Sequence, residues 1–176
     1  MARFMEVPPG KQRLKRAYLH LMLWFTGRAV QAAAKVDPQI KAEFRAMPKD
    51  YTICLGAFPS GPAMVVGKTP EGKVKYLGRR LKEGRADLNL TLKSLDHFFL
   101  LFTFQESTPT ASARDRLFVD GDICQACAMI RILDAVQVYL LPRFIAKLAI
   151  KRYPSWSLKR HTLDRAHIYL RTLLGF

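Results

Sequence analysis

The chain has 176 residues and three cysteines, and 49% of its residues are hydrophobic. This composition indicates one globular domain in a reducing compartment, and it excludes a disordered chain or a disulfide-stapled scaffold. The net charge of +15 predicts a polyanionic partner, but residues 1–36 carry +6, residues 141–176 carry +7 and residues 37–140 only +2, which disfavours a uniform nucleic-acid-binding surface.

The first predicted element is an amphipathic helix over residues 11–35. Its apolar residues, Leu14, Ala17 and Leu21 among them, recur at spacings of three and four and predict one apolar face. Cations at its start oppose the helix dipole, which suggests an external anion. A second helix is predicted over 38–47, because Pro38 suits the first turn of a helix and Pro48 ends it.

The periodicity then changes to that of strands. Short β-rich runs with Gly and Pro between them predict four strands, at residues 51–58, 63–67, 73–78 and 86–93. In the last of these runs Leu88, Leu90 and Leu92 alternate with polar residues. This alternation predicts a strand with one covered face and one face in water.

A helix over residues 95–104 follows Ser94, a good N-cap residue. This helix is apolar almost all round, which indicates either burial on all sides or a position between a sheet and a ligand cavity. A polar connection leads to a strand at 116–121. A helix then runs to Pro142, and further helices are predicted over 143–152 and 157–174.

The helix before Pro142 contains Cys124 and Cys127 in a Cys-x-x-Cys spacing. Such a pair at a helix N-terminus is typical of thiol oxidoreductases, and with two further ligands it would hold zinc. No such ligands accompany it, and Cys127 shares an apolar stripe with Ile123, Ile130 and Leu133. Packing is therefore the favoured interpretation of the pair, with a thiol oxidoreductase as one alternative. No phosphate-binding loop or nucleophile motif occurs, and we expect neither an enzyme nor a cofactor nor a metal site.

Two stretches, "ADLNLTLKSLDHFFLLF" and "RLFVDGDICQACAMIRIL", resemble the sterol carrier protein 2 family. The shared features are an alternating strand that opens with Ala86-Asp87, an apolar helix after it, and a strand that ends at Gly121-Asp122 before another helix. The resemblance covers roughly residues 40–140. The basic N-terminal helix and the Leu133-Asp134-Ala135 segment are similar to a bacterial accessory lipid carrier of ubiquinone biosynthesis.

The resemblance implies an α+β fold: a mainly antiparallel five-stranded sheet, covered on one face by helices that enclose a hydrophobic tunnel. It implies a carrier for a fatty acid, phospholipid, sterol-like lipid or prenyl quinone, with enzymes of a lipid or quinone pathway as possible partners. We expect a basic N-terminal helix at 1–37, a lipid-binding domain at 38–142 and basic C-terminal helices at 143–176. The expected pocket residues are Phe98, Phe99, Phe102, Ile123, Cys127, Ile130 and Leu133.

The basic ends are expected to dock the protein on anionic lipid headgroups. The expected docking cations are Lys11, Arg13, Lys15, Arg16, Lys147, Lys151, Arg152, Lys159 and Arg160. Residues 11–25 imitate a signal peptide, but His20 interrupts the apolar run, and no apolar stretch approaches the ~20 residues of a spanning helix. We therefore expect a cytoplasmic protein at the inner face of a membrane. The alternative is a nucleic-acid-binding module that uses the same basic ends.

Overall fold

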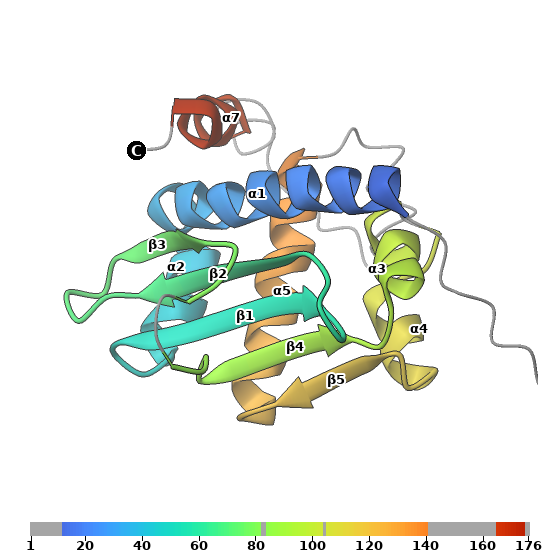
Figure 1. The fold of residues 1–176 in the computed structure, drawn as a ribbon. Coiled ribbons are helices and arrows are strands. Elements are labelled where there is room, and N and C mark those ends of the chain that lie inside the picture. Colours follow the sequence, from blue (N-terminus) through green and yellow to red (C-terminus); the bar gives the residue numbers. More distant parts are fainter. Residues whose placement is uncertain (1–11, 82–83, 104, 141–164, 175–176) are drawn as a thin grey trace, which may run out of the picture.

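The computed structural model describes residues 12–81, 84–103, 105–140 and 165–174, and it has an α+β fold around one five-stranded sheet (Figure 1). The strands lie in the order β3-β2-β1-β4-β5. Their bounds are Tyr51–Ala57 for β1, Ala63–Lys68 for β2, Val74–Gly78 for β3, Leu88–Leu92 for β4 and Leu117–Asp120 for β5.

Three of the four strand pairings are antiparallel, and β1 pairs with β4 in parallel. The predicted five-stranded, mainly antiparallel sheet is confirmed. The parallel pair arises because the chain leaves β3 at one edge and returns to the other side of β1, next to which β4 then lies.

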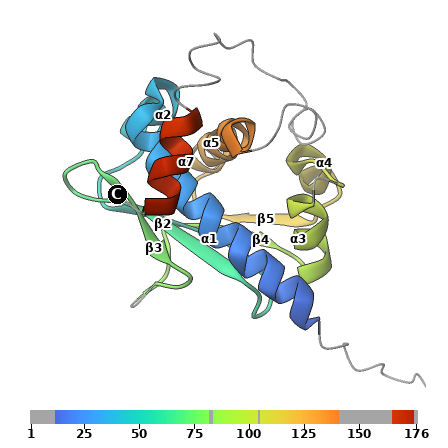
Figure 2. The same ribbon diagram turned by 90° about the horizontal axis from the view of Figure 1, so that it is seen from above.

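The helices lie on one side of the sheet, with α7 outside α1 (Figure 2). Their bounds are Arg13–Val36 for α1, Pro38–Ala46 for α2, Leu95–Phe102 for α3, Thr108–Ala113 for α4, Ile123–Leu140 for α5 and Arg165–Leu174 for α7. The sequence analysis missed α4, although Ser107 accepts a hydrogen bond from Thr110 N as its N-cap and Pro109 stands in its first turn. The helix predicted over 143–152 and the start of the one over 157–174 lie outside the described residues.

Strand alternation decides which side chains meet the helices. Leu88, Leu90 and Leu92 of β4 are at most 1% exposed and point toward the helices, as the alternation predicted. Ile53 and Leu55 of β1 lie on the same face, because each is paired in register with a β4 leucine. The hydrophobic core therefore lies between this face of the sheet and helices α1, α2 and α5.

Helix α1 buries a different face from the one that was predicted. Leu19, Leu23 and Val30 are fully buried, whereas Leu14 is 87% exposed and Leu21 is 58% exposed. Both faces are apolar in sequence, and the sheet covers the one that lets α1 approach closely. At Gly27 a Cβ atom would lie 2.5 Å from the Tyr76 ring of β3, so only glycine fits this crossing.

Helix α5 meets the length and composition expected of a membrane span, which the sequence analysis did not anticipate. Seven of its eighteen residues are buried, and it packs against α1, α2 and β4. Its Arg131 also forms a two-point ion pair with Glu43 of α2, at 2.7 and 2.8 Å. In this fold α5 is the central core helix.

Candidate functional site

A small apolar cavity lies between the inner face of the sheet and helices α1, α3, α4 and α5. Its volume is about 30 Å³. Eight of its eleven lining side chains are apolar and none is charged. The lining consists of Leu55, Leu90, Leu92, Leu101, Phe102, Leu117, Ile130 and Leu133, together with the polar Thr26, Thr108 and Gln137.

The cavity is closed around a space far smaller than a lipid. Ligand pockets typically have volumes of about 300–1,000 Å³, whereas a single water occupies about 30 Å³. This cavity, lined by described residues, is therefore too small for an acyl or prenyl chain as it stands, and the expected tunnel remains a prediction.

The wall formed by α3 and α4 is more thinly packed than the wall formed by α5. These helices have eight and six residues, and only Phe98 and Ala111 among them are fully buried apolar residues. Segments with few buried apolar contacts open at lower free energy than the core elements. The opposite wall, α5, is held by its seven buried residues.

The helix predicted over 95–104 is not buried on all sides, which leaves the other interpretation, a position between the sheet and a cavity. Within α3 only Phe98 is fully buried, and its ring meets that of Phe102 edge to face at 5.0 Å. Phe99 is half-buried, and its ring meets Tyr18 of α1 at 5.5 Å. The helix lies at the edge of the core. One part of its apolar surface contacts α1, and another part lines the cavity.

Three of the seven predicted pocket residues line the cavity: Phe102, Ile130 and Leu133. The other two on α5 lie outside it, since Ile123 is 72% exposed and Cys127 is also exposed. The buried stripe of α5 runs one position away from the predicted one, through Ala126, Met129, Ile132 and Val136. Any contact of Ile123 or Cys127 with a lipid remains a prediction.

Five lining leucines were not among the predicted pocket residues: Leu55, Leu90, Leu92, Leu101 and Leu117. Four of them lie on predicted strands, where the alternation of side chains was the signal for an inward position. Leu101 lies near the end of the helix predicted over 95–104. The polar lining residues Thr26, Thr108 and Gln137 had no signal of their own, because each comes from a different helix.

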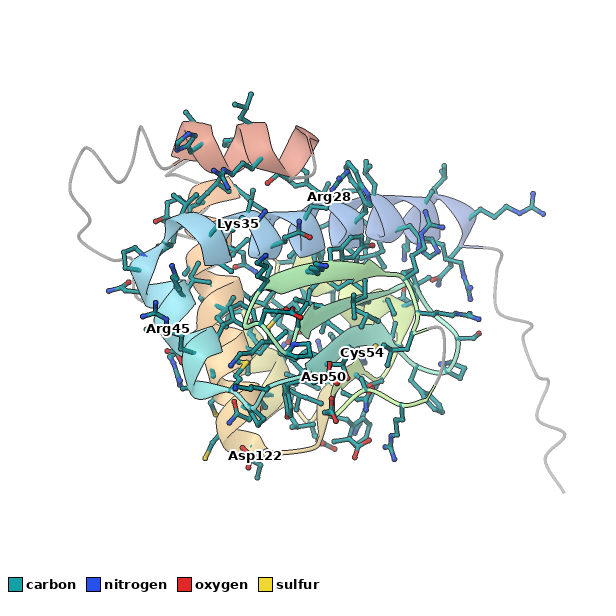
Figure 3. The ribbon with its side chains drawn as sticks, turned by 90° about the vertical axis from the view of Figure 1, so that its left-hand side faces the viewer. Arg28, Lys35, Arg45, Asp50, Cys54 and Asp122 are labelled. Atoms are coloured by element: carbon teal, nitrogen blue, oxygen red, sulfur yellow. The ribbon has the colours of Figure 1, made fainter. Side chains whose placement is uncertain are left out.

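The favoured interpretation of the cysteine pair as packing is wrong. Both Cys124 and Cys127 are exposed on the first turns of α5, which Asp122 caps by accepting a hydrogen bond from Gln125 N at 2.9 Å. Cys54 lies apart from them on the sheet, as the separation of Cys54 and Asp122 shows (Figure 3). Burial raises the pKa of the Cys54 thiol. Within the described ranges, no three His, Cys, Asp or Glu side chains gather in a way that would hold a metal ion.

Asp134 is a titratable group on α5, next in the chain to the cavity residue Leu133. It lies one turn beyond Ile130. It is half-buried, and burial raises its pKa from 3.8 to about 6, because desolvation disfavours the carboxylate. The folded protein therefore binds this proton more tightly than the unfolded chain does.

We expect Asp134→Asn to stabilise the protein at pH 7.5 and to leave its stability unchanged near pH 4. Between the unfolded and folded pKa values the folded state holds more protons, so the free energy of unfolding of the parent protein falls as the pH rises from 4 to 6. After discounting for solvent screening of a half-buried group, the gain at pH 7.5 is about 1 kcal/mol. Urea unfolding at both pH values measures it.

The control for this substitution is Asp115→Asn, which changes an exposed aspartate that pairs with Lys93 and is not expected to stabilise. A gain of equal size at pH 4 and pH 7.5 for Asp134→Asn would contradict desolvation of the carboxylate as its cause.

The described docking cations surround the start of α1. Arg13 and Arg16 are exposed, and Lys15 is half-buried with its ammonium 2.6 Å from Asp96 of α3. Arg13 and Lys15 lie on either side of the exposed stripe formed by Leu14, Ala17 and Leu21, whereas Arg16 lies nearer the opposite face of α1. The remaining predicted cations, Lys11, Lys147, Lys151, Arg152, Lys159 and Arg160, lie outside the described residues.

No protein-family model and no curated protein matches the chain. Among solved structures, it is similar to a UbiJ-SCP2 ubiquinone synthesis protein at 16% identity, over 75% of this chain and 97% of that one, with a TM-score of 0.42. It is also similar to the apo form of sterol carrier protein 2 from Yarrowia lipolytica, at 20% identity over 64% and 88% of the two chains, with a TM-score of 0.44. The palmitated SCP2L2 of Aedes aegypti matches at 14% identity over 58% and 94%, with a TM-score of 0.36. The solved structures to which this chain is similar are thus sterol carrier protein 2 domains, the family that its sequence motifs resemble.

Proposed function

We propose that this protein is a non-enzymatic lipid carrier that holds the apolar part of its ligand between the sheet and the α3–α4 wall. The observation that carries the proposal is the cavity itself, an uncharged and largely apolar space with one thinly packed wall. The ligand class is a fatty acid, phospholipid, sterol-like lipid or prenyl quinone.

The chemistry of the lining favours a lipid over a polar metabolite. A dozen methylene groups transferred from water to an apolar site contribute on the order of 10 kcal/mol, at about 0.8 kcal/mol each. That gain offsets the displacement of a short helix with one fully buried apolar side chain. Thr26, Thr108 and Gln137 provide neutral hydrogen-bonding groups for a carbonyl or hydroxyl, but none provides a charge for a phosphate or carboxylate.

The exposed face of α1 supports docking of this carrier on an anionic membrane. Leu14 and Leu21 project into solvent two turns apart, with Arg13 and Lys15 on either side of them. An apolar stripe flanked by cations is typical of helices that lie in the membrane interface. Nucleic acid would engage the cations but would leave the exposed leucines in water, so the membrane is the better fit. This stripe and its cations support a carrier that works at the cytoplasmic face of a membrane.

The proposal is tested by native mass spectrometry of the purified full chain, followed by organic extraction and identification of the lipid. We expect a bound fatty acid, phospholipid or quinone, or stoichiometric uptake of a fluorescent fatty acid by protein that purifies empty. A protein that carries no lipid and takes up none would sink the carrier function, and the cavity would then be a packing defect.

A further inference from the structure

Side chains from the N-cap and the first two turns of α1 contact α3, which forms part of the thinly packed wall of the cavity. The Lys15 ammonium lies 2.6 Å from Asp96 Oδ1, and Gln12 Nε2 donates to Asp96 Oδ2 at 3.2 Å. The Tyr18 hydroxyl donates to the backbone carbonyl of Phe102 at 3.1 Å. These contacts hold α3, and with it the cavity residue Phe102, against α1.

Lys15 is the contact that an external anion can compete for. Its side chain is 42% exposed and that of Asp96 is 54% exposed, and the ammonium lies 5.5 Å from the centre of the Phe99 ring. Lys15 and Gln12 hold the pKa of the Asp96 carboxyl below its usual value, so this carboxyl is ionised at neutral pH. Exposed ion pairs of this kind contribute little stability and exchange readily with other charges.

The same corner of the molecule is suited to an anionic headgroup. A surface groove of about 250 Å³ lies between α1, the 58–61 loop and the start of α3. Arg16 and Lys93 line it together with the Asp96 carboxylate that Lys15 neutralises. Arg16 donates to the Ser60 carbonyl at 3.3 Å, and the groove residue Phe58 is 62% exposed. Cations around a groove with an exposed aromatic ring next to it complement a phosphate above an acyl layer.

We propose that docking on an anionic phospholipid surface draws Lys15 away from Asp96 and releases α3, so that the cavity opens only where lipid is available. The inference rests on the proposed carrier function and adds its regulation. Lys15 flanks the exposed Leu14, so a bilayer that contacts this stripe brings its phosphates within reach of the ammonium. Loss of the ion pair leaves α3 held by the Tyr18 hydrogen bond and by Phe98.

The test uses the full chain and donor vesicles of phosphatidylcholine, with or without phosphatidylglycerol, that carry a fluorescent fatty acid. For the parent protein we expect transfer of the fatty acid to be faster from vesicles that contain phosphatidylglycerol. Asp96→Asn should speed transfer from neutral vesicles, by up to about fivefold for loss of an exposed ion pair, and should weaken the dependence on phosphatidylglycerol.

The matched control is Asp120→Asn, which removes an exposed Arg–Asp pair with Arg85 that does not join α1 to α3 and does not line the groove. It should transfer lipid like the parent protein. Lys15→Gln is the second variant: it breaks the same pair from the other side, so it should also speed transfer from neutral vesicles.

Hydrogen exchange of the α3 amides provides a readout that does not depend on lipid uptake. We expect faster exchange in Asp96→Asn, and in the parent protein on vesicles with phosphatidylglycerol. Equal transfer rates for Asp96→Asn and parent from neutral vesicles, with equally protected α3 amides, would overturn the inference while leaving the carrier function standing. Faster α3 exchange with no fatty-acid uptake by any variant would instead refute the carrier function.

Discussion

Replacing Leu133 with tryptophan is expected to lower the affinity for a fatty acid at least tenfold. Leu133 points into the cavity from α5, the wall that is held in place by seven buried residues. The larger indole would occupy space that at least two methylene groups of the ligand need, at about 0.8 kcal/mol each. That loss corresponds to a dissociation constant about ten times larger. Titration with a fluorescent fatty acid measures it.

Ala46→Trp is the control for this substitution, because Ala46 is exposed at the end of α2 and lies away from the cavity. Circular dichroism and thermal unfolding of both variants would show that the fold is retained. Unchanged affinity in a folded Leu133→Trp protein would mean that the lipid binds elsewhere. Ile123→Trp extends the experiment to the exposed start of α5, where weakened binding would support the predicted contact of Ile123 with the ligand.

Asp37→Ala is expected to lower the free energy of unfolding by about 3 kcal/mol. Asp37 is fully buried where α1 turns into α2. Its Oδ1 accepts hydrogen bonds from Gln39 N at 2.7 Å and Ile40 N at 3.2 Å, and its Oδ2 accepts one from the Tyr139 hydroxyl of α5 at 2.6 Å. Loss of the N-cap costs about 1 kcal/mol, and removing the buried acceptor of a hydroxyl costs about 1–3 kcal/mol.

Tyr139→Phe separates the two contributions, since it removes the hydroxyl that donates to Asp37 and leaves the N-cap carboxylate in place. It should lower the free energy of unfolding by about 1 kcal/mol, the net value of one hydrogen bond. Urea unfolding followed by circular dichroism measures both variants. A cost for Asp37→Ala no larger than that for Tyr139→Phe would show that the cap contributes nothing.

The strands and most helices follow from local pattern. The alternating leucines of 88–92 predicted both the strand and the face that it buries, because successive strand side chains point to opposite faces whatever the partner. The start of α2 was likewise predicted from a local signal, Pro38 in its first turn. α4 escaped prediction because a six-residue helix has too few turns to show a periodicity.

Choices between two apolar faces could not be made from the sequence. Along α1 both the Leu14–Leu21 face and the Leu19–Leu23 face read as apolar, and only the sheet determines which one is buried. Likewise Cys127 and Ala126 are neighbours on α5, yet Cys127 is exposed and Ala126 buried, because the direction of the helix over the sheet sets the buried stripe.

By itself, then, the sequence determined the order of the strands and of the helices other than α4, the concentration of charge at the ends, and the resemblance to lipid carriers, which implied the five-stranded α+β class. Those properties depend on residues close together in the chain. The closed cavity, the thin α3–α4 wall and the Lys15–Asp96 contact were decided only by the tertiary structure. Each of them brings together residues that are distant in the chain, such as Leu55 with Leu133, and local periodicity carries no information about which distant faces will meet.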